Sequence, residues 1–180
     1  MTSRDWRADV LKFWFGLEPK QWWGSSPELD HRIKQQFLRL WAEKRQLPVE
    51  SFLGDPLTAL AGVILFDQFP RNMFRGSSEQ FATDHLALAI AKGALAEDFD
   101  KQFEKQERCF VYMPFQHSEN RDDQNRSVLL FTELGDANFL KFAKSHHDII
   151  EKFGRFPHRN SVLGRAPRPA ELAAGEVTPW

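Results

Sequence analysis

The sequence predicts an all-α fold, an array of antiparallel helical hairpins joined by short loops. Three observations support this class. Apolar residues recur at spacings of three and four along most of the 180 residues, as on the buried face of a helix. Residues that start or end helices interrupt this pattern at regular intervals. Segments of alternating polar and apolar residues, which would indicate strands, are few.

The first two helices follow from amphipathic stripes with clear ends. The first stripe ends near Gly16 and consists of Trp6, Val10, Phe13, Trp14 and Leu17. The second helix is predicted to begin with Ser26 as N-cap and Pro27 at the first helical position. Pro48 ends it at about residue 46 or 47.

The third segment is apolar nearly all round, from Leu57 to Phe66. A strand is the alternative, because the string VILF is also typical of strands. The start signal Asp55-Pro56 and the length of the segment, up to Phe69, favour a helix buried on several sides. We predict that Pro70 stops this helix.

Two further helices are predicted in the middle of the chain. Ser77 or Ser78 begins the first of them, which fades near Gly93. The other runs from about residue 100 to residue 113 and ends before Pro114.

The last two helices have the clearest signals. Ser118 is the expected N-cap of the sixth helix and Asp136 that of the seventh. Gly154 is the expected glycine after the seventh helix, whose apolar stripe includes His146. We therefore predict one helical domain over residues 1–165 and a Pro-rich tail over residues 166–180, with a short helix near Glu171 in an otherwise loose segment.

Composition excludes several classes of protein. Twenty-four Lys and Arg against 25 Asp and Glu give a formal charge of −1, without the basic excess of a nucleic-acid-binding protein. The single cysteine, Cys109, excludes an internal disulfide and a cysteine-based zinc cluster, and its apolar surroundings predict a core residue. No apolar run is long enough to span a membrane, and the first residues lack the apolar core of a secretory signal, so we expect a cytoplasmic protein.

Five short strings occur in order between about residue 10 and residue 165: FWFG (13–16), DQFPRN (67–72), PFQHSE (114–119), QNRSV (124–128) and GRFPHRN (154–160). Together they resemble a bacterial domain-of-unknown-function family with an all-helical, tetratricopeptide-like fold. The resemblance implies tetratricopeptide-like hairpins and carries no assigned activity. Gln116 and Asn125 each replace a glutamate that this family usually has, which weakens any mechanism that needs paired acids there.

Three polar clusters lie at predicted helix ends, and we predict that they converge on one site. The predicted ligand-binding residues are Asp67, Arg71 and Asn72 in the first cluster, His117 and Gln124 in the second, and His146, Arg155, His158, Arg159 and Asn160 in the third. Residues 141–169 hold seven Lys or Arg and only two Asp or Glu. Because arginine forks bind carboxylates and phosphates, a small anionic ligand or a peptide carboxylate is the predicted partner.

Other functions stay open at this point. A hydrolase is the first alternative, with His117, Glu119 and His146 as candidate catalytic residues and His as general base, with or without a metal. His and carboxylate side chains suit zinc or iron, but nothing in the sequence fixes their spacing, so we predict no metal and no cofactor. The second alternative is a protein-interaction scaffold with an apolar groove near Trp22 and Trp23, in which the polar clusters only tie helices together.

Overall fold

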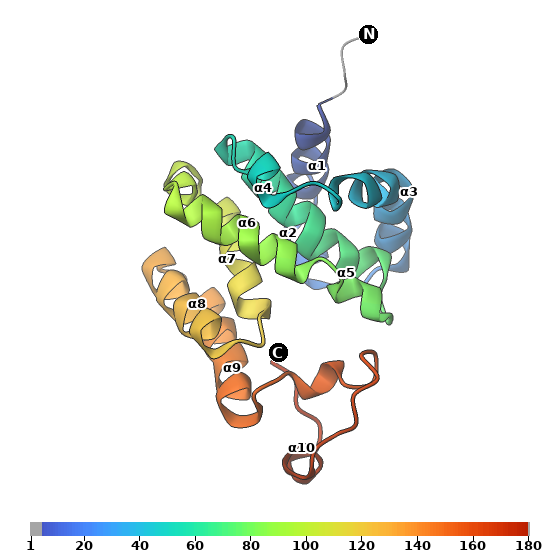
Figure 1. Ribbon diagram of the computed structural model, residues 1–180, viewed down its shortest axis with the longest axis vertical. Helices are drawn as coiled ribbons and strands as arrows, with labels where there is room; N and C mark the ends of the chain where they lie inside the picture. Colours follow the sequence, from blue (N-terminus) through green and yellow to red (C-terminus); the bar gives the residue numbers. More distant parts are fainter. Residues whose placement is uncertain (1–4, 180) are drawn as a thin grey trace. The chain divides into compact units, whose positions relative to one another are not determined.

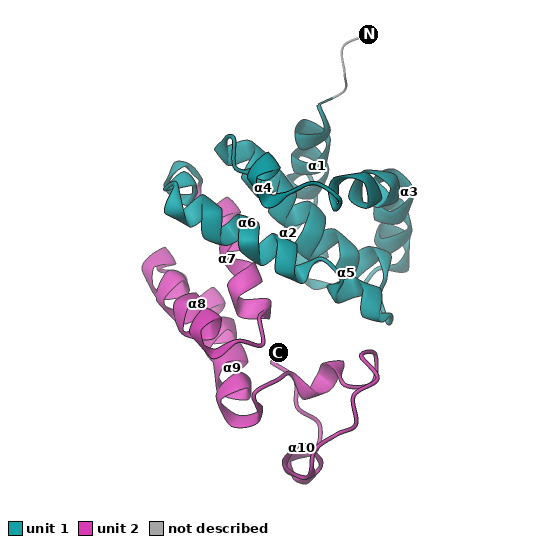
Figure 2. Cartoon of the chain, in the orientation of Figure 1, with its two compact units in different colours: residues 1–103 teal, residues 104–180 magenta. Residues whose placement is uncertain are grey.

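The structure is a computed structural model that describes residues 5–179. These residues form helices and loops without a strand, which confirms the all-α prediction (Figure 1). The chain divides into two compact units, Met1–Phe103 and Glu104–Trp180 (Figure 2). The prediction of a single domain over residues 1–165 stays a prediction, because a domain can hold more than one compact unit.

From residue 5 onward, unit 1 contains six α-helices linked by loops and short 3-10 turns. Their bounds are α1 Trp6–Phe15, α2 Pro19–Trp23, α3 Pro27–Lys44, α4 Pro56–Val63, α5 Phe69–Met73 and α6 Asp84–Ala96. A π-helical segment, Ile64–Gln68, joins α4 to α5 without a break. Helix α3 packs against α5, and α4 packs against α1 and α6.

Unit 2 begins with three helices, each packed against the next. Their bounds are α7 Lys105–His117, α8 Arg121–Leu134 and α9 Ala137–Phe153, and the short helix α10 Pro169–Ala174 follows near the end of the chain. As predicted, α10 contains Glu171. None of the helices in residues 5–179 combines the length and the apolar character needed to cross a membrane.

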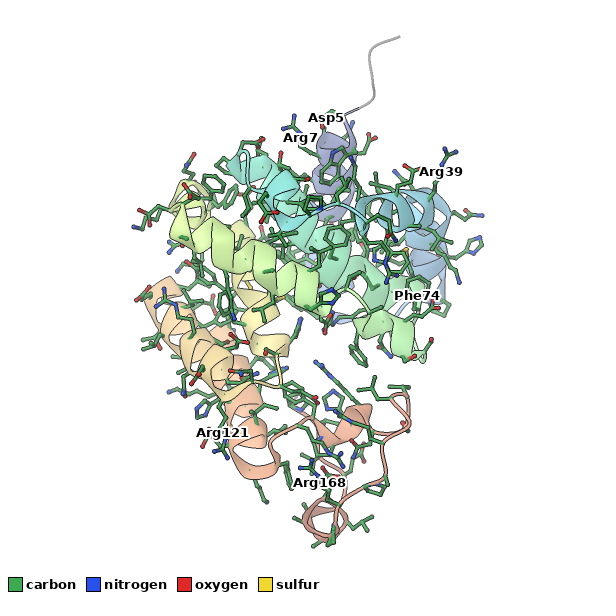
Figure 3. The ribbon with its side chains drawn as sticks, viewed as in Figure 1. Asp5, Arg7, Arg39, Phe74, Arg121 and Arg168 are labelled. Carbon is green, nitrogen blue, oxygen red and sulfur yellow. The ribbon has the colours of Figure 1, made fainter. Side chains whose placement is uncertain are left out.

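Local capping signals predicted three helix starts correctly. Two others are wrong: α6 begins at Asp84, because Ser77 caps only a 3-10 turn, and α7 begins at Lys105 and not at about residue 100. The side chains of Ser26, Asp55 and Asp136 each accept a backbone N–H in the first turn of the helix that follows. An N-cap of this kind is worth about 1 kcal/mol, since it satisfies a helix-end donor. Asp5 has the same role for α1 and also holds Arg7, whose Nε lies 2.9 Å from Asp5 Oδ1 (Figure 3). Gly154, with φ of 70°, ends α9 in the left-handed conformation that glycine allows.

The prediction that Pro70 stops the third helix is wrong. The helix widens to π geometry, in which the N–H of Phe69 bonds to the carbonyl of Ile64, and then continues as α5. Pro70 has no N–H to donate to the carbonyl of Phe66, four residues earlier. The hydroxyl of Thr83 donates to that carbonyl instead, at 2.7 Å, and Trp41 Nε1 donates to the same hydroxyl at 3.1 Å. A side chain from another part of unit 1 therefore completes the bonding that proline interrupts.

Two predicted boundaries in unit 2 are also wrong. Helix α7 does not end before Pro114 but contains it and continues to His117. Pro114 and its neighbours Met113 and Phe115 are buried. Burial of one large apolar side chain stabilises the fold by about 1.5–3 kcal/mol, which is comparable to the cost of about 3 kcal/mol for a proline inside a helix. The N-cap of α8 is Asn120, two residues after the predicted Ser118. The Ser118 hydroxyl instead donates to the Asp123 carboxylate at 2.7 Å.

The FWFG and DQFPRN strings contribute, together with Phe37 of α3, to the aromatic centre of unit 1. The rings of Phe37 and Phe69 lie 4.6 Å apart, and Trp14 meets Phe69 edge to face at 5.8 Å. All three side chains are buried. The short helix α2, which the sequence analysis did not anticipate, places Trp22 against Trp14, with Trp22 Nε1 donating to the Trp14 carbonyl at 2.9 Å.

Candidate functional site

Two imidazoles and one guanidinium pack around the ring of Phe156 in unit 2, and a third imidazole lies beside one of them. The ring centres of His146 and His158 lie 5.5 and 5.6 Å from that of Phe156, and Arg159 stacks over the same ring at 4.6 Å. His117 completes the group, with its ring centre 6.2 Å from that of His146. We call His117, His146, His158 and Arg159 the imidazole–arginine cluster. It joins the second and third polar clusters of the sequence.

Each member of the imidazole–arginine cluster comes from a defined element. His117 is the last residue of α7, and His146 lies on the buried face of α9. His158 and Arg159 lie in a 3-10 turn, Pro157–Arg159, that follows α9. Arg159 Nη2 donates to the backbone carbonyl of His117 at 3.0 Å, which links this turn to the end of α7.

The position of His146 fixes its protonation pattern. Only 7% of the residue is exposed, and Nδ1 lies 2.8 Å from the backbone oxygen of Phe142, one turn earlier on α9. Because a carbonyl oxygen only accepts, the proton of the neutral ring is assigned to Nδ1. Nε2 then carries the lone pair, since the hydrogen bond that the ring makes within residues 5–179 is the one between Nδ1 and Phe142.

Their surroundings hold His146 and His158 neutral. Burial lowers the pKa of His146 to about 3, aided by His117, Arg159 and His158, while the hydrogen bond to Phe142 acts in the opposite direction. Burial and the charge of Arg159 lower the pKa of His158 to about 4, against the influence of Glu119. Both imidazoles are therefore neutral at neutral pH.

Glu119 ties the loop after α7 to the segment after α9. Its Oε1 accepts the backbone N–H of Phe156 at 2.7 Å, and Arg165 makes a two-pronged ion pair with it at 2.8 and 3.0 Å. Burial opposes its ionisation, but the hydrogen bonds from Arg165 and Phe156 outweigh burial and lower the pKa of Glu119. Glu119 thus positions Phe156, the centre of the cluster.

A second carboxylate holds the C-terminal segment. Glu171, only 4% exposed, accepts from Arg155 at 2.6 and 2.8 Å and from Asn160 at 2.9 Å. The hydrogen bond from Arg155 is the main reason why the pKa of Glu171 falls to about 2. Arg168, labelled in Figure 3, donates to the backbone oxygen of Phe153 at 3.2 Å. The tail is therefore held by several contacts and is not the loose segment that we predicted; residue 180 lies outside the described residues.

Gln124 acts on the end of α7. It is fully buried, as its place on the helix predicts, and Nε2 donates to the carbonyls of Gln116 and Ser118, at 2.7 Å each. These carbonyls flank His117, so Gln124 positions the first histidine of the cluster.

The first polar cluster belongs to unit 1, where it makes internal ion pairs. Arg71 makes a two-pronged ion pair with Asp84 at 2.8 and 2.9 Å, and its Nη1 lies 3.3 Å from Asp67 Oδ1. Although burial opposes the charge, Asp67 and Asp84 raise the pKa of Arg71. Asn72 donates to Asp30 at 2.8 Å. These contacts tie elements of unit 1 together, as the scaffold alternative expects of the polar clusters.

Metal and thiol chemistry find little support in the described part of the chain. Residues 5–179 contain no group of three or more His, Cys, Asp or Glu side chains placed to hold a metal ion. Cys109 is buried, as predicted, and burial raises the pKa of its thiol. A buried thiol of this kind is not a reactive nucleophile.

Two exposed apolar surfaces are relevant to the alternative of a protein-interaction scaffold. A hollow of about 490 Å³ lies between α8 and α9, lined by Asn125, Val128, Leu129, Lys144, His147 and Asp148. Leu129 is 56% exposed there, and Trp23 of unit 1 is 53% exposed. Single exposed apolar residues are common on protein surfaces, so the scaffold stays a prediction.

Comparison with known proteins identifies the family. The profile of DUF924, described as a bacterial protein of unknown function, matches residues 10–174. The chain belongs to the DUF924 family. A solved structure of a protein of unknown function from Agrobacterium tumefaciens superimposes with a TM-score of 0.87 at 35% sequence identity, covering 94% of this chain and 96% of that one. No curated protein matches the sequence.

The family assignment confirms the resemblance seen in the sequence strings. Neither DUF924 nor the Agrobacterium protein has an assigned activity, so neither supplies a substrate or a reaction. Three important residues were not among the predicted site residues: Phe156, Arg165 and Glu171. Phe156 lies inside the string GRFPHRN, and this string was the sequence signal from which its role could have been predicted. No local pattern in the sequence pairs Arg165 with Glu119 or Glu171 with Arg155.

Proposed function

We propose that this DUF924 protein binds a small anion at the imidazole–arginine cluster of unit 2. The ligand is a carboxylate, a phosphate or the carboxylate of a peptide. The observation that carries the proposal is the buried cation of Arg159, which lies with the imidazoles of the cluster around the ring of Phe156.

The charges and the exposure of the cluster support an anion. Arg159 is only 7% exposed, and its charge lowers the pKa values of both His146 and His158. The same positive potential favours an anion, and imidazole and guanidinium N–H groups donate to its oxygens. His117 and His158 are half-buried, so solvent reaches the cluster.

Asp67, Arg71 and Asn72 are not part of the proposed site, because their side chains make ion pairs and hydrogen bonds within unit 1. Arg155 and Asn160 hold Glu171, and Gln124 holds the end of α7, so we assign them positioning roles around the cluster. The predicted ligand contacts are then His117, His146, His158 and Arg159.

Thermal unfolding with added anions tests the proposal. Sulfate, phosphate, acetate and a dipeptide are titrated into the full chain and into Arg159→Gln. At ten times the dissociation constant a bound ligand stabilises the folded state by about 1.4 kcal/mol, which corresponds to roughly 3–6 °C for a chain of this size. We expect at least one anion to give this shift in the wild type and none to give it in Arg159→Gln.

Arg121→Gln is the matched control. Arg121 lies on α8 in the same unit, is 62% exposed and pairs with Glu151 at the surface (Figure 3). This variant loses the same charge and should keep the full shift. Equal shifts in the two variants, or no shift in the wild type with any of the four anions, would contradict the proposal.

A further inference from the structure

The tautomer of His146 sets a condition on any anion that binds beside it. Nδ1 donates its proton to the backbone oxygen of Phe142 at 2.8 Å, and this oxygen cannot donate in return. The proton of the neutral ring is therefore held on the side that faces the α9 backbone. On the opposite side of the ring, Nε2 presents a lone pair, which repels the oxygens of an anion.

A proton on Nε2 would remove this repulsion. The doubly protonated ring keeps its bond to Phe142 and gains a second N–H that can donate to an anion. Without a ligand the doubly protonated form is unfavourable, because burial and the neighbouring cation oppose it. A bound anion reverses this balance, since its charge attracts the imidazolium.

The groups that face His146 come from several elements. His117 at the end of α7, and His158 and Arg159 in the turn after α9, all disfavour its protonation. The carboxylate of Glu119, in the loop after α7, is engaged by Arg165 in a two-pronged ion pair. Neutralised in this way, Glu119 is not the group that would stabilise a charged His146.

We propose that the ligand of the cluster is a dianionic oxyanion of the phosphate or sulfate type, and that it binds together with one proton taken up from solvent at Nε2 of His146. This inference rests on the proposed function, because it concerns the same site. A dianion fits better than a monoanion for two reasons. Its tetrahedral oxygens can accept from Arg159 and from an imidazolium at once, and its second charge favours the protonated ring more strongly.

Calorimetry with sulfate measures the proton directly. Sulfate keeps both charges at neutral and mildly acidic pH, so a proton taken up on binding is taken up by the protein. Titrations of the full chain are run in two buffers with different ionisation enthalpies, and the difference in heat gives the number of protons. We expect uptake of about one proton, and an affinity that rises about tenfold for each unit of decrease in pH where the uptake is complete.

His146→Asn separates the two nitrogens. The asparagine amide can still donate to the Phe142 carbonyl, but it lacks a group that titrates. We expect this variant to bind sulfate more weakly, with no proton uptake and no pH dependence. His147→Asn is the control, because His147 is the next residue on α9 and contacts Asn125 outside the cluster, 3.0 Å away. It should behave as the wild type does.

The outcomes distinguish the two proposals. Sulfate binding without proton uptake, at an affinity that does not change with pH, would overturn this inference and leave the anion site in place. Absence of sulfate and phosphate binding down to the lowest pH at which the chain stays folded would overturn both, with the proposed function failing first. Should His146→Asn not fold, the imidazole nitrogen NMR signals of the wild type decide: Nε2 of His146 must change from unprotonated to protonated when sulfate is added, and an unchanged signal refutes the inference.

Discussion

Thr83→Val is expected to destabilise unit 1, because one hydroxyl serves two buried groups. Thr83 is 1% exposed, and its hydroxyl donates to the backbone oxygen of Phe66 and accepts from Trp41 Nε1. Phe66 needs this donor because Pro70 cannot supply the usual helical N–H. Valine has nearly the same shape as threonine, so the exchange removes the hydrogen bonds and leaves the packing.

The size of the effect follows from the two groups left without partners. A buried polar group that loses its hydrogen bond costs about 1–3 kcal/mol. Phe66 is fully buried and Trp41 is 5% exposed, so water compensates neither well. We expect a loss of about 2–4 kcal/mol, which for a chain of this size corresponds to roughly 5–15 °C in melting temperature.

Urea unfolding followed by circular dichroism provides the measurement, with Thr83→Ser as the matched variant. Serine keeps the hydroxyl and removes a methyl group, so it should lose about 1 kcal/mol or less through packing. If Thr83→Val proves as stable as Thr83→Ser, the hydroxyl does not complete the helix at Pro70, and our explanation of the uninterrupted helix is wrong.

Two further outcomes concern unit 2. Glu119→Ala should raise the hydrogen-exchange rate of the Phe156 amide at least tenfold, because that N–H loses its acceptor. The control Glu133→Ala changes an exposed residue of α8 and should leave this rate unchanged. Equal exchange rates in both variants would count against the positioning role of Glu119. The free energy of unfolding should fall as the pH drops from about 6.5 to about 4, because the unfolded chain protonates His146 and His158 near pH 6.5 while the folded chain resists protonation until their pKa values of about 3 and 4. His146 alone contributes a slope of up to about 1.4 kcal/mol per pH unit, so His146→Asn should give a shallower pH profile in urea unfolding, and an unchanged slope would refute the assignment.

The helix starts after Ser26, Asp55 and Asp136 could be predicted from the sequence because their causes are local. A side chain such as Ser26 or Asp136 bonds to a backbone N–H two or three residues later, and this geometry needs no distant partner. The periodicity around His146 likewise predicted its burial correctly, because a helix presents every third or fourth residue to one side.

Helix ends at proline could not be predicted in the same way, because tertiary contacts decide them. Pro70 would stop an isolated helix, but the Thr83 hydroxyl from a later segment replaces the missing bond. Pro114 is likewise tolerated among buried neighbours. In both cases the deciding groups lie outside the local pattern that the prediction used.

The candidate site shows the same division between local and distant causes. That His117, His146 and the GRFPHRN segment carry unusual polar groups was visible in the sequence. The ring of Phe156, about which these groups gather, and the carboxylates of Glu119 and Glu171, which hold the segment after α9, depend on pairings across 37 and 16 residues. No spacing rule gives such pairings, so the sequence could name the members of the cluster but not its geometry.

The protonation of His146 also bears on the hydrolase alternative. A general base works best when its pKa lies near the working pH, whereas burial and neighbouring positive groups hold the pKa of His146 at about 3. A base this weak takes a proton from water or a hydroxyl poorly, and its Nδ1 proton is held by a backbone oxygen where a catalytic triad would place a carboxylate. The same two features suit a binding site whose proton arrives with the ligand. If a hydrolytic activity is found, the His146→Asn exchange should therefore alter how that activity depends on phosphate and pH more than it alters the maximal rate. A variant that loses the maximal rate but still binds phosphate as the wild type does would restore the catalytic alternative.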